Sequence, residues 1–106
     1  MAVTHLQYNI QISEPRSINA EYGHAGIVAS GDLEVLLEKY ELNGAAEIDI
    51  NTKVVGYDEV WQAVIKRFIE KNAVGNIRIA INDNAATPAV VTKRLAQALS
   101  DAGGLA

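Results

Sequence analysis

The sequence predicts a two-layer α+β domain, in which two helices pack on one face of a mainly antiparallel sheet of about four strands. Several segments alternate apolar and polar residues, which indicates strands, and two segments in the second half of the chain have helical periodicity. The strand segments mostly carry polar residues at every second position. A sheet covered on both faces would show continuous apolar runs instead, so we expect one face of the sheet to be solvated.

The first element is a strand over residues 5–12, where the even positions are apolar and the odd positions are polar. A period of two is typical of a half-buried strand. Pro15 lies in the turn or loop that follows, because proline cannot continue a hydrogen-bonded ladder. Residues 23–29 are glycine-spaced and lead to a corner at Ser30-Gly31-Asp32, and we assign them no regular structure.

Residues 33–40 fit both a strand and a helix on pattern alone, with Leu33 and Leu37 buried in either case. The residues that follow favour the strand. Asn43-Gly44 is a strong turn signal, and residues 46–51 beyond it alternate as a second clear strand. A chain that turns tightly into a strand is expected to be leaving one.

A first helix is predicted over residues 58–72, because apolar residues, Trp61 among them, recur three and four positions apart. Residues 76–82 alternate as a further strand. A second helix is predicted to start at Thr87-Pro88, because threonine is a good N-cap and proline suits the first helical position. Gly103-Gly104 is expected to end this helix. The predicted order is strand–strand–strand–helix–strand–helix.

The composition limits the classes of function. The chain has 106 residues, which is enough for one domain over residues 1–106. The net charge is -4 and the basic residues are scattered, which argues against nucleic-acid binding. The absence of cysteine removes disulfides, thiolate catalysis and cysteine-based zinc sites. No signal peptide or membrane-length apolar segment is recognisable, so we expect a cytoplasmic protein without a membrane partner.

Ser30-Gly31-Asp32 is the stretch best suited to covalent chemistry. On these three residues alone a simple turn is the favoured interpretation, since all three residue types are common in turns. A nucleophile elbow would need a following helix with histidine and acidic partners, and the pattern places neither His5 nor His24 beside Ser30. A serine without a base is a poor nucleophile but a suitable attachment point.

The polar segment Asn82-Asp83-Asn84 offers oxygen ligands without the spacing of a calcium loop, and we predict no metal site there. A loop that leads into a helix cap explains it. Alternatively, these residues line a pocket near the helix N-terminus, where backbone amides favour anions. Trp61 is predicted to be a core residue.

Two segments resemble one protein family. Residues 26–36, which contain Ser30-Gly31-Asp32, resemble the attachment segment of the malonate decarboxylase acyl carrier subunit, its delta subunit. Residues 84–91, together with Arg94-Leu95 and residues 97–99, resemble the final loop and helix of the same family. The two motifs occur in the right order, so the resemblance spans roughly the whole chain after the first strand. Ala29 and Ala85 stand where the family often has glycine.

The resemblance implies a non-catalytic carrier. In this family, the serine at the Ser30 position carries a phosphodiester-linked 2'-(5''-triphosphoribosyl)-3'-dephospho-coenzyme A, and Gly31 and Asp32 are its flanking motif. A prosthetic-group transferase (holo-carrier synthase) attaches this arm. The implied partners are the transferase and decarboxylase subunits of malonate decarboxylase and a malonyl transferase. The arm's thiol would carry acetyl and malonyl groups while malonate is converted to acetate and CO2.

Two alternatives remain open on the sequence. One is the acyl carrier subunit of citrate or citramalate lyase, a more distant relative that shares the Ser-Gly-Asp corner. The other is a non-covalent α+β binding module, whose surface would be the solvated sheet face with Gln7, Asn9, Glu47 and Asp49.

Overall fold

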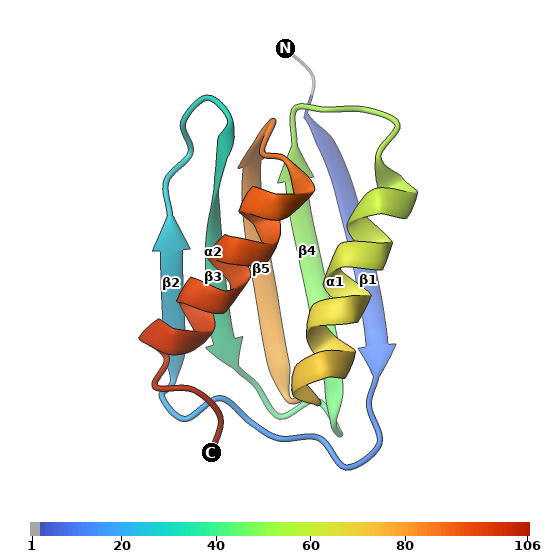
Figure 1. The fold of residues 1–106 in the computed structure, drawn as a ribbon. Coiled ribbons are helices and arrows are strands. Elements are labelled where there is room, and N and C mark those ends of the chain that lie inside the picture. Colours follow the sequence, from blue (N-terminus) through green and yellow to red (C-terminus); the bar gives the residue numbers. More distant parts are fainter. Residues whose placement is uncertain (1–2) are drawn as a thin grey trace.

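A five-stranded mixed sheet forms one layer of the molecule and two helices form the other, in a computed structural model that describes residues 3–106 (Figure 1). The predicted fold class is confirmed, with five strands in place of about four. The elements in chain order are β1 (Thr4–Gln11), β2 (Tyr22–Gly26), β3 (Asp32–Lys39), β4 (Ala45–Thr52), α1 (Asp58–Asn72), β5 (Ile77–Asn84) and α2 (Pro88–Asp101).

The strands lie in the order β1-β4-β5-β3-β2. Of the strand pairings within residues 3–106, β4 with β5 is parallel, with α1 as the crossover, and the other three are antiparallel. The tight turn at Asn43-Gly44 is present, with both residues at positive φ. It does not form a hairpin, because β5 lies between β3 and β4. The Asn76 side chain fixes this turn by accepting hydrogen bonds from the amides of Leu42 and Gly44 at 3.0 and 2.8 Å.

The additional strand is β2, which covers most of the glycine-spaced segment. Gly23 faces α2 so closely that a methyl group there would lie 2.2 Å from the carbonyl oxygen of Ala98. The glycine therefore allows the helix backbone to pack directly on the strand. This close approach explains why β2 lacks the bulky alternating residues that identify the other strands.

Both helices lie where the sequence predicts them. The helix α1 occupies the predicted residues, and α2 begins at Pro88 with the Thr87 hydroxyl accepting a hydrogen bond from the Val90 amide at 3.3 Å. The two helices cover the same face of the sheet (Figure 1). Trp61 is buried in the core, as expected.

The other sheet face is polar and open. Gln7 and Asn9 of β1 pair with Asp49 and Glu47 of β4, and Glu47 forms an ion pair with Arg78 at 3.4 Å. This is the solvated face that the alternation predicts. No helix within residues 3–106 is long and apolar enough to span a bilayer.

Candidate functional site

Ser30 lies in the turn that connects β2 and β3. The Asp32 amide donates a hydrogen bond to the Ala29 carbonyl oxygen at 2.9 Å, which closes a turn with Ser30 and Gly31 at its centre. Gly31 has a φ of 74°, the conformation that a type II turn requires at this position and that glycine adopts most readily. The turn presents Ser30 to solvent.

A hydrogen bond and the β3–β5 ladder attach the turn to the end of β5. The Gly31 amide donates a hydrogen bond to the Asn84 carbonyl oxygen at 2.8 Å, and Asp32 is paired with Asn84 at the start of the β3–β5 ladder. Ser30 therefore stands at the end of the sheet where β4 and β5 terminate and both helices begin (Figure 1). We call this end of the molecule the Ser30 end.

Asp32 forms a two-pronged ion pair with Arg94 of α2. The Arg94 Nε and Nη2 atoms donate to the two carboxylate oxygens at 3.0 and 2.9 Å. The Arg94 Nη1 atom donates to Gln97 at 2.7 Å, and the Leu33 amide donates to Asp32 at 2.8 Å. This geometry matches the fork of the guanidinium to the carboxylate and aligns α2 with the turn that carries Ser30.

The electrostatics follow from these contacts. The hydrogen bonds from Arg94, and then the one from the Leu33 amide, hold the pKa of Asp32 below its ordinary value. The same bonds to Asp32 raise the pKa of Arg94. The carboxylate next to Ser30 is thus neutralised by a permanent cation. Asp32 is part of the Ser30-Gly31-Asp32 motif, and its ion pair with Arg94 also positions α2 against the turn.

Both histidines are hydrogen-bonded to carboxylates other than that of Asp32. His24 bonds to Glu34 at 3.2 Å on the open sheet face, and His5 bonds to Asp49 there. Within residues 3–106, no hydrogen bond joins either histidine to Ser30. The hydrogen bonds from His24 and then Asn82 also lower the pKa of Glu34. In the described part of the chain, Ser30 is therefore not hydrogen-bonded to a histidine as the serine of a catalytic triad is.

The polar segment 82–84 belongs to the end of β5 rather than to a loop. Asp83 is buried, and its carboxylate accepts hydrogen bonds from the Thr52 hydroxyl at 2.8 Å and from the amides of Ala85 and Ala86 at 3.2 and 3.1 Å. Its oxygens fix the connection to α2. Ala85 has a φ of 64°, the conformation that favours the glycine expected here.

Exposed apolar side chains gather around the Ser30 end. Ile27 and Val28, in the same loop as Ser30, are 64% and 51% exposed. The other large apolar side chains exposed at this end are Val3, Val55, Tyr57 and Val60. Most of the large apolar side chains that are exposed within residues 3–106 therefore lie at the Ser30 end.

Sequence reasoning assigned no role to Arg94. A signal was available, because Arg94 lies three positions after Val91 and four before Ala98, on the buried stripe of α2. A cation on such a stripe requires a nearby acidic partner. The sequence pattern alone did not identify Asp32 as that partner, since the pair spans two distant segments.

Comparison with known proteins matches most of the chain to one family. The family model described as "Malonate decarboxylase delta subunit (MdcD)" matches residues 21–102. The malonate decarboxylase acyl carrier protein of Malonomonas rubra is 50% identical over 97 residues, which cover 92% of this chain and 87% of that protein. The corresponding protein of Xanthomonas axonopodis pv. citri (strain 306) is 46% identical, with 89% of this chain and 90% of that protein covered.

A solved structure has a similar fold. One chain in the crystal structure of a Pseudomonas malonate decarboxylase hetero-tetramer in complex with malonate superimposes with a TM-score of 0.77 and 31% sequence identity. The match covers 97% of this chain and 100% of that chain. The resemblance therefore extends over the whole sheet and both helices.

Proposed function

This chain belongs to the family of malonate decarboxylase delta subunits, the acyl carrier subunits of that enzyme, and we propose that it carries acyl groups on an arm attached to Ser30. The observation that carries the proposal is the exposed serine on a turn fixed to both β5 and α2. The named relatives are malonate decarboxylase subunits, which favours this enzyme over the citrate or citramalate lyase alternative.

The residues around Ser30 suit the proposed arm, for which 2'-(5''-triphosphoribosyl)-3'-dephospho-coenzyme A is the precursor. A methyl group placed on Gly31 would meet no atom within 4 Å apart from its chain neighbours, so the turn next to Ser30 is open to solvent on that side. The nearest carboxylate, Asp32, is neutralised by Arg94, which reduces repulsion of an incoming phosphate. When bound, the arm would supply the thiol on which acetyl and malonyl groups are carried as thioesters.

Ser30 would accept the arm as a nucleophile that a transferase activates. Its Oγ would form a bond to the phosphorus next to the ribose, while the bond from that phosphorus to the outer two phosphates breaks. Pyrophosphate would leave, because a phosphodiester retains one phosphorus of the triphosphate. The hydroxyl proton would pass to a base of the transferase, since His5 and His24 are bonded elsewhere.

The proposed partners are the other subunits of malonate decarboxylase, the malonyl transferase, and the holo-carrier synthase that loads Ser30. The similar chain in the Pseudomonas hetero-tetramer supports association with other malonate decarboxylase subunits. We assign the carrier itself no catalytic step. An arm on a fixed turn presents its thioester to successive enzyme sites at high effective concentration.

Substitution of Ser30 tests this function. The wild-type protein, co-expressed with its maturation enzymes, should gain the mass of the arm precursor less pyrophosphate. Ser30→Ala should keep the unmodified mass, whereas Ser100→Ala, at another exposed serine, should be modified like the wild type. An unmodified wild type, or a modified Ser30→Ala, would contradict the proposal.

A further inference from the structure

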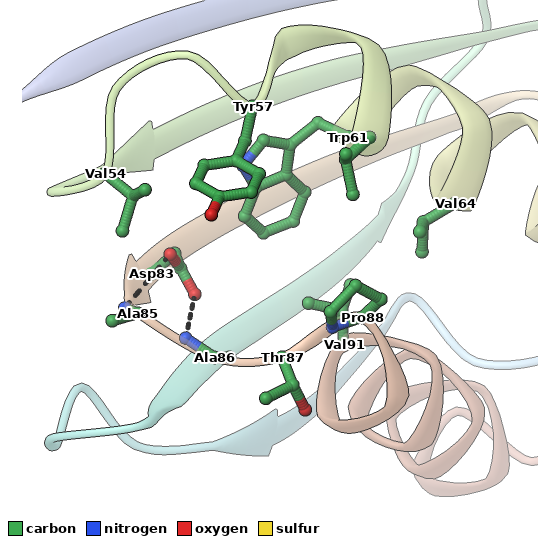
Figure 2. Close-up of a pocket in the computed structure, with 11 residues that line it drawn as sticks. Val54, Tyr57, Trp61, Val64, Asp83, Ala85, Ala86, Thr87, Pro88 and Val91 are labelled. Atoms are coloured by element: carbon green, nitrogen blue, oxygen red, sulfur yellow. Dashed lines mark hydrogen bonds between the residues drawn. The ribbon is translucent and has the colours of Figure 1, made fainter.

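A pocket of about 260 Å3 opens between the first turns of α1 and α2, at the Ser30 end (Figure 2). Trp61 and Val64 of α1 face Pro88 and Val91 of α2 across it. Asp83, at the end of β5, is the charged residue in its lining. The pocket is therefore an apolar cleft with one buried carboxylate.

The pocket lies close to the turn that carries Ser30. The Gly31 amide is bonded to the Asn84 carbonyl oxygen, and the next residue, Ala85, lines the pocket. The pocket lies over the ends of β4 and β5, and Ser30 precedes β3. Since neighbouring strands are about 4.8 Å apart, their offset in the plane of the sheet is one or two strand spacings, roughly 5 to 10 Å, and the pocket lies above that plane on the helix side. A flexible group attached to Ser30 can span this distance.

The size of the pocket suits the end of a chain-like ligand. An apolar cavity of about 150 Å3 accepts benzene, and pockets for whole drug-sized ligands start at about 300 Å3. A volume of about 260 Å3 thus takes a short acyl group with the adjoining part of its arm. A nucleotide would not fit.

The carboxylate of Asp83 in the pocket is already hydrogen-bonded within the fold. The Thr52 hydroxyl accepts a hydrogen bond from the Val54 amide and donates its proton to Asp83, whose carboxylate also accepts from two amides. This carboxylate already occupies the amide donors that could have received an anion. A second carboxylate would be desolvated among apolar side chains and repelled by Asp83.

We propose that this pocket shelters the uncharged acyl end of the arm on Ser30 and excludes the same arm when its acyl group carries a carboxylate. The proposal rests on the proposed function, because it needs the arm. An acetyl group would be held in the pocket while the carrier is not bound to a partner enzyme. A malonyl group would stay outside, available to the decarboxylase.

Trp61 can report on the pocket by its fluorescence, and the thiol of the arm can be labelled selectively. Trp61 is the single tryptophan, is 6% exposed and lines the pocket, so its emission responds to the pocket's contents. The chain has no cysteine, so the arm's thiol is the one thiol that alkylating reagents can modify. Iodoacetamide would give it an uncharged cap and iodoacetate a nearly isosteric anionic cap.

The experiment compares the two capped forms of the modified wild type after intact mass has verified arm and cap. The uncharged cap should shift Trp61 emission relative to Ser30→Ala, and the anionic cap should leave the emission as in Ser30→Ala. With modification verified, equal emission from both caps would overturn the pocket proposal and leave the proposed function intact. An unmodified mass would overturn the proposed function, and the pocket's role with it.

A blocking variant adds a second readout. Ala86→Phe places a ring at the pocket while keeping the backbone amide that bonds to Asp83. It should abolish the emission difference between the two caps. Ala89→Phe, on the exposed side of α2 and outside this pocket, should preserve the difference. If folded Ala86→Phe still shows the emission difference between the two caps, the proposal is overturned. If Ala86→Phe does not fold, the comparison of the two caps on the wild type still tests the proposal, because it requires no substitution.

Discussion

At the scale of single residues, the position of Ser30 is set by the hydrogen bonds of its neighbours Gly31 and Asp32. Gly31 is bonded to β5 and Asp32 to α2, so the backbone on the C-terminal side of the serine is fixed while its own side chain is exposed. A fixed, exposed and unactivated hydroxyl suits a site that another enzyme modifies.

The contribution of Asp32 to stability should depend on pH. Because the pKa of Asp32 is lowered in the folded state, its pairing with Arg94 is complete at neutral pH and is lost as the pH falls through the lowered pKa. Asp32→Asn should therefore have a lower Tm than the wild type at pH 7, and the difference should shrink below pH 3.8, the ordinary pKa. Thermal unfolding of both proteins from pH 7 to pH 2 measures this.

Arg94→Gln should show the same pH profile, because it removes the other half of the pair. A Tm difference that stays constant down to pH 2 would refute the role of the pair.

At neutral pH, Asp32→Asn should remain folded and be loaded more slowly, because the turn loses its ion pair with α2. An unchanged loading rate and unchanged complex assembly would count against that tie.

Two glycines of the site should differ in their tolerance of a methyl group. Both have positive φ, which costs an alanine about 1 to 2 kcal/mol. Gly31→Ala meets no atom within 4 Å, so this cost should be the whole loss of stability. Gly26→Ala would place its methyl carbon 2.0 Å from the Leu33 carbonyl oxygen, so we expect a total of about 2 to 5 kcal/mol. Urea unfolding of the two variants gives the comparison, and equal losses would contradict it.

At the scale of elements, local chemistry predicted the helices well. Thr87 and Pro88 start α2 because a cap and a fixed φ act within one turn, and the apolar stripe of α1 is a property of consecutive residues. The strand β2 escaped prediction because its glycines meet a requirement set by α2, which packs against Gly23 from another part of the chain. Side chains that would mark a strand are excluded there by the fold itself.

The loop between β2 and β3 should also contribute to partner binding. Ile27→Asp with Val28→Asp removes two exposed apolar side chains next to Ser30 without touching the core. We expect at least a tenfold weaker association with the other malonate decarboxylase subunits, measured by calorimetry, since burying each side chain contributes about 1.5 to 3 kcal/mol. Tyr22→Asp, 62% exposed at the opposite end of β2, is the control and should bind like the wild type. Equal affinities for all three proteins would exclude this loop from the interface.

At the scale of the whole molecule, the arrangement of strands joins two distant motifs. The crossover through α1 places β5 between β4 and β3, which brings Asn84 to Gly31 and Arg94 to Asp32. Alternation along one strand reveals its buried face but not its neighbours, so the strand order could not be predicted from the pattern. The candidate serine was predictable from local residues and family resemblance. Its tie to α2 and the nearby pocket depend on contacts between distant segments.

The central claim is that Ser30 is the attachment point, and the mass of the protein from its native source tests it most directly. Trypsin cleavage after Arg16 and Lys39 releases residues 17–39, which contain Ser17 and Ser30. We predict that this peptide carries the mass of the arm precursor less pyrophosphate, and that fragmentation places the added mass on Ser30. An unmodified peptide, or an added mass on Ser17, would contradict the account.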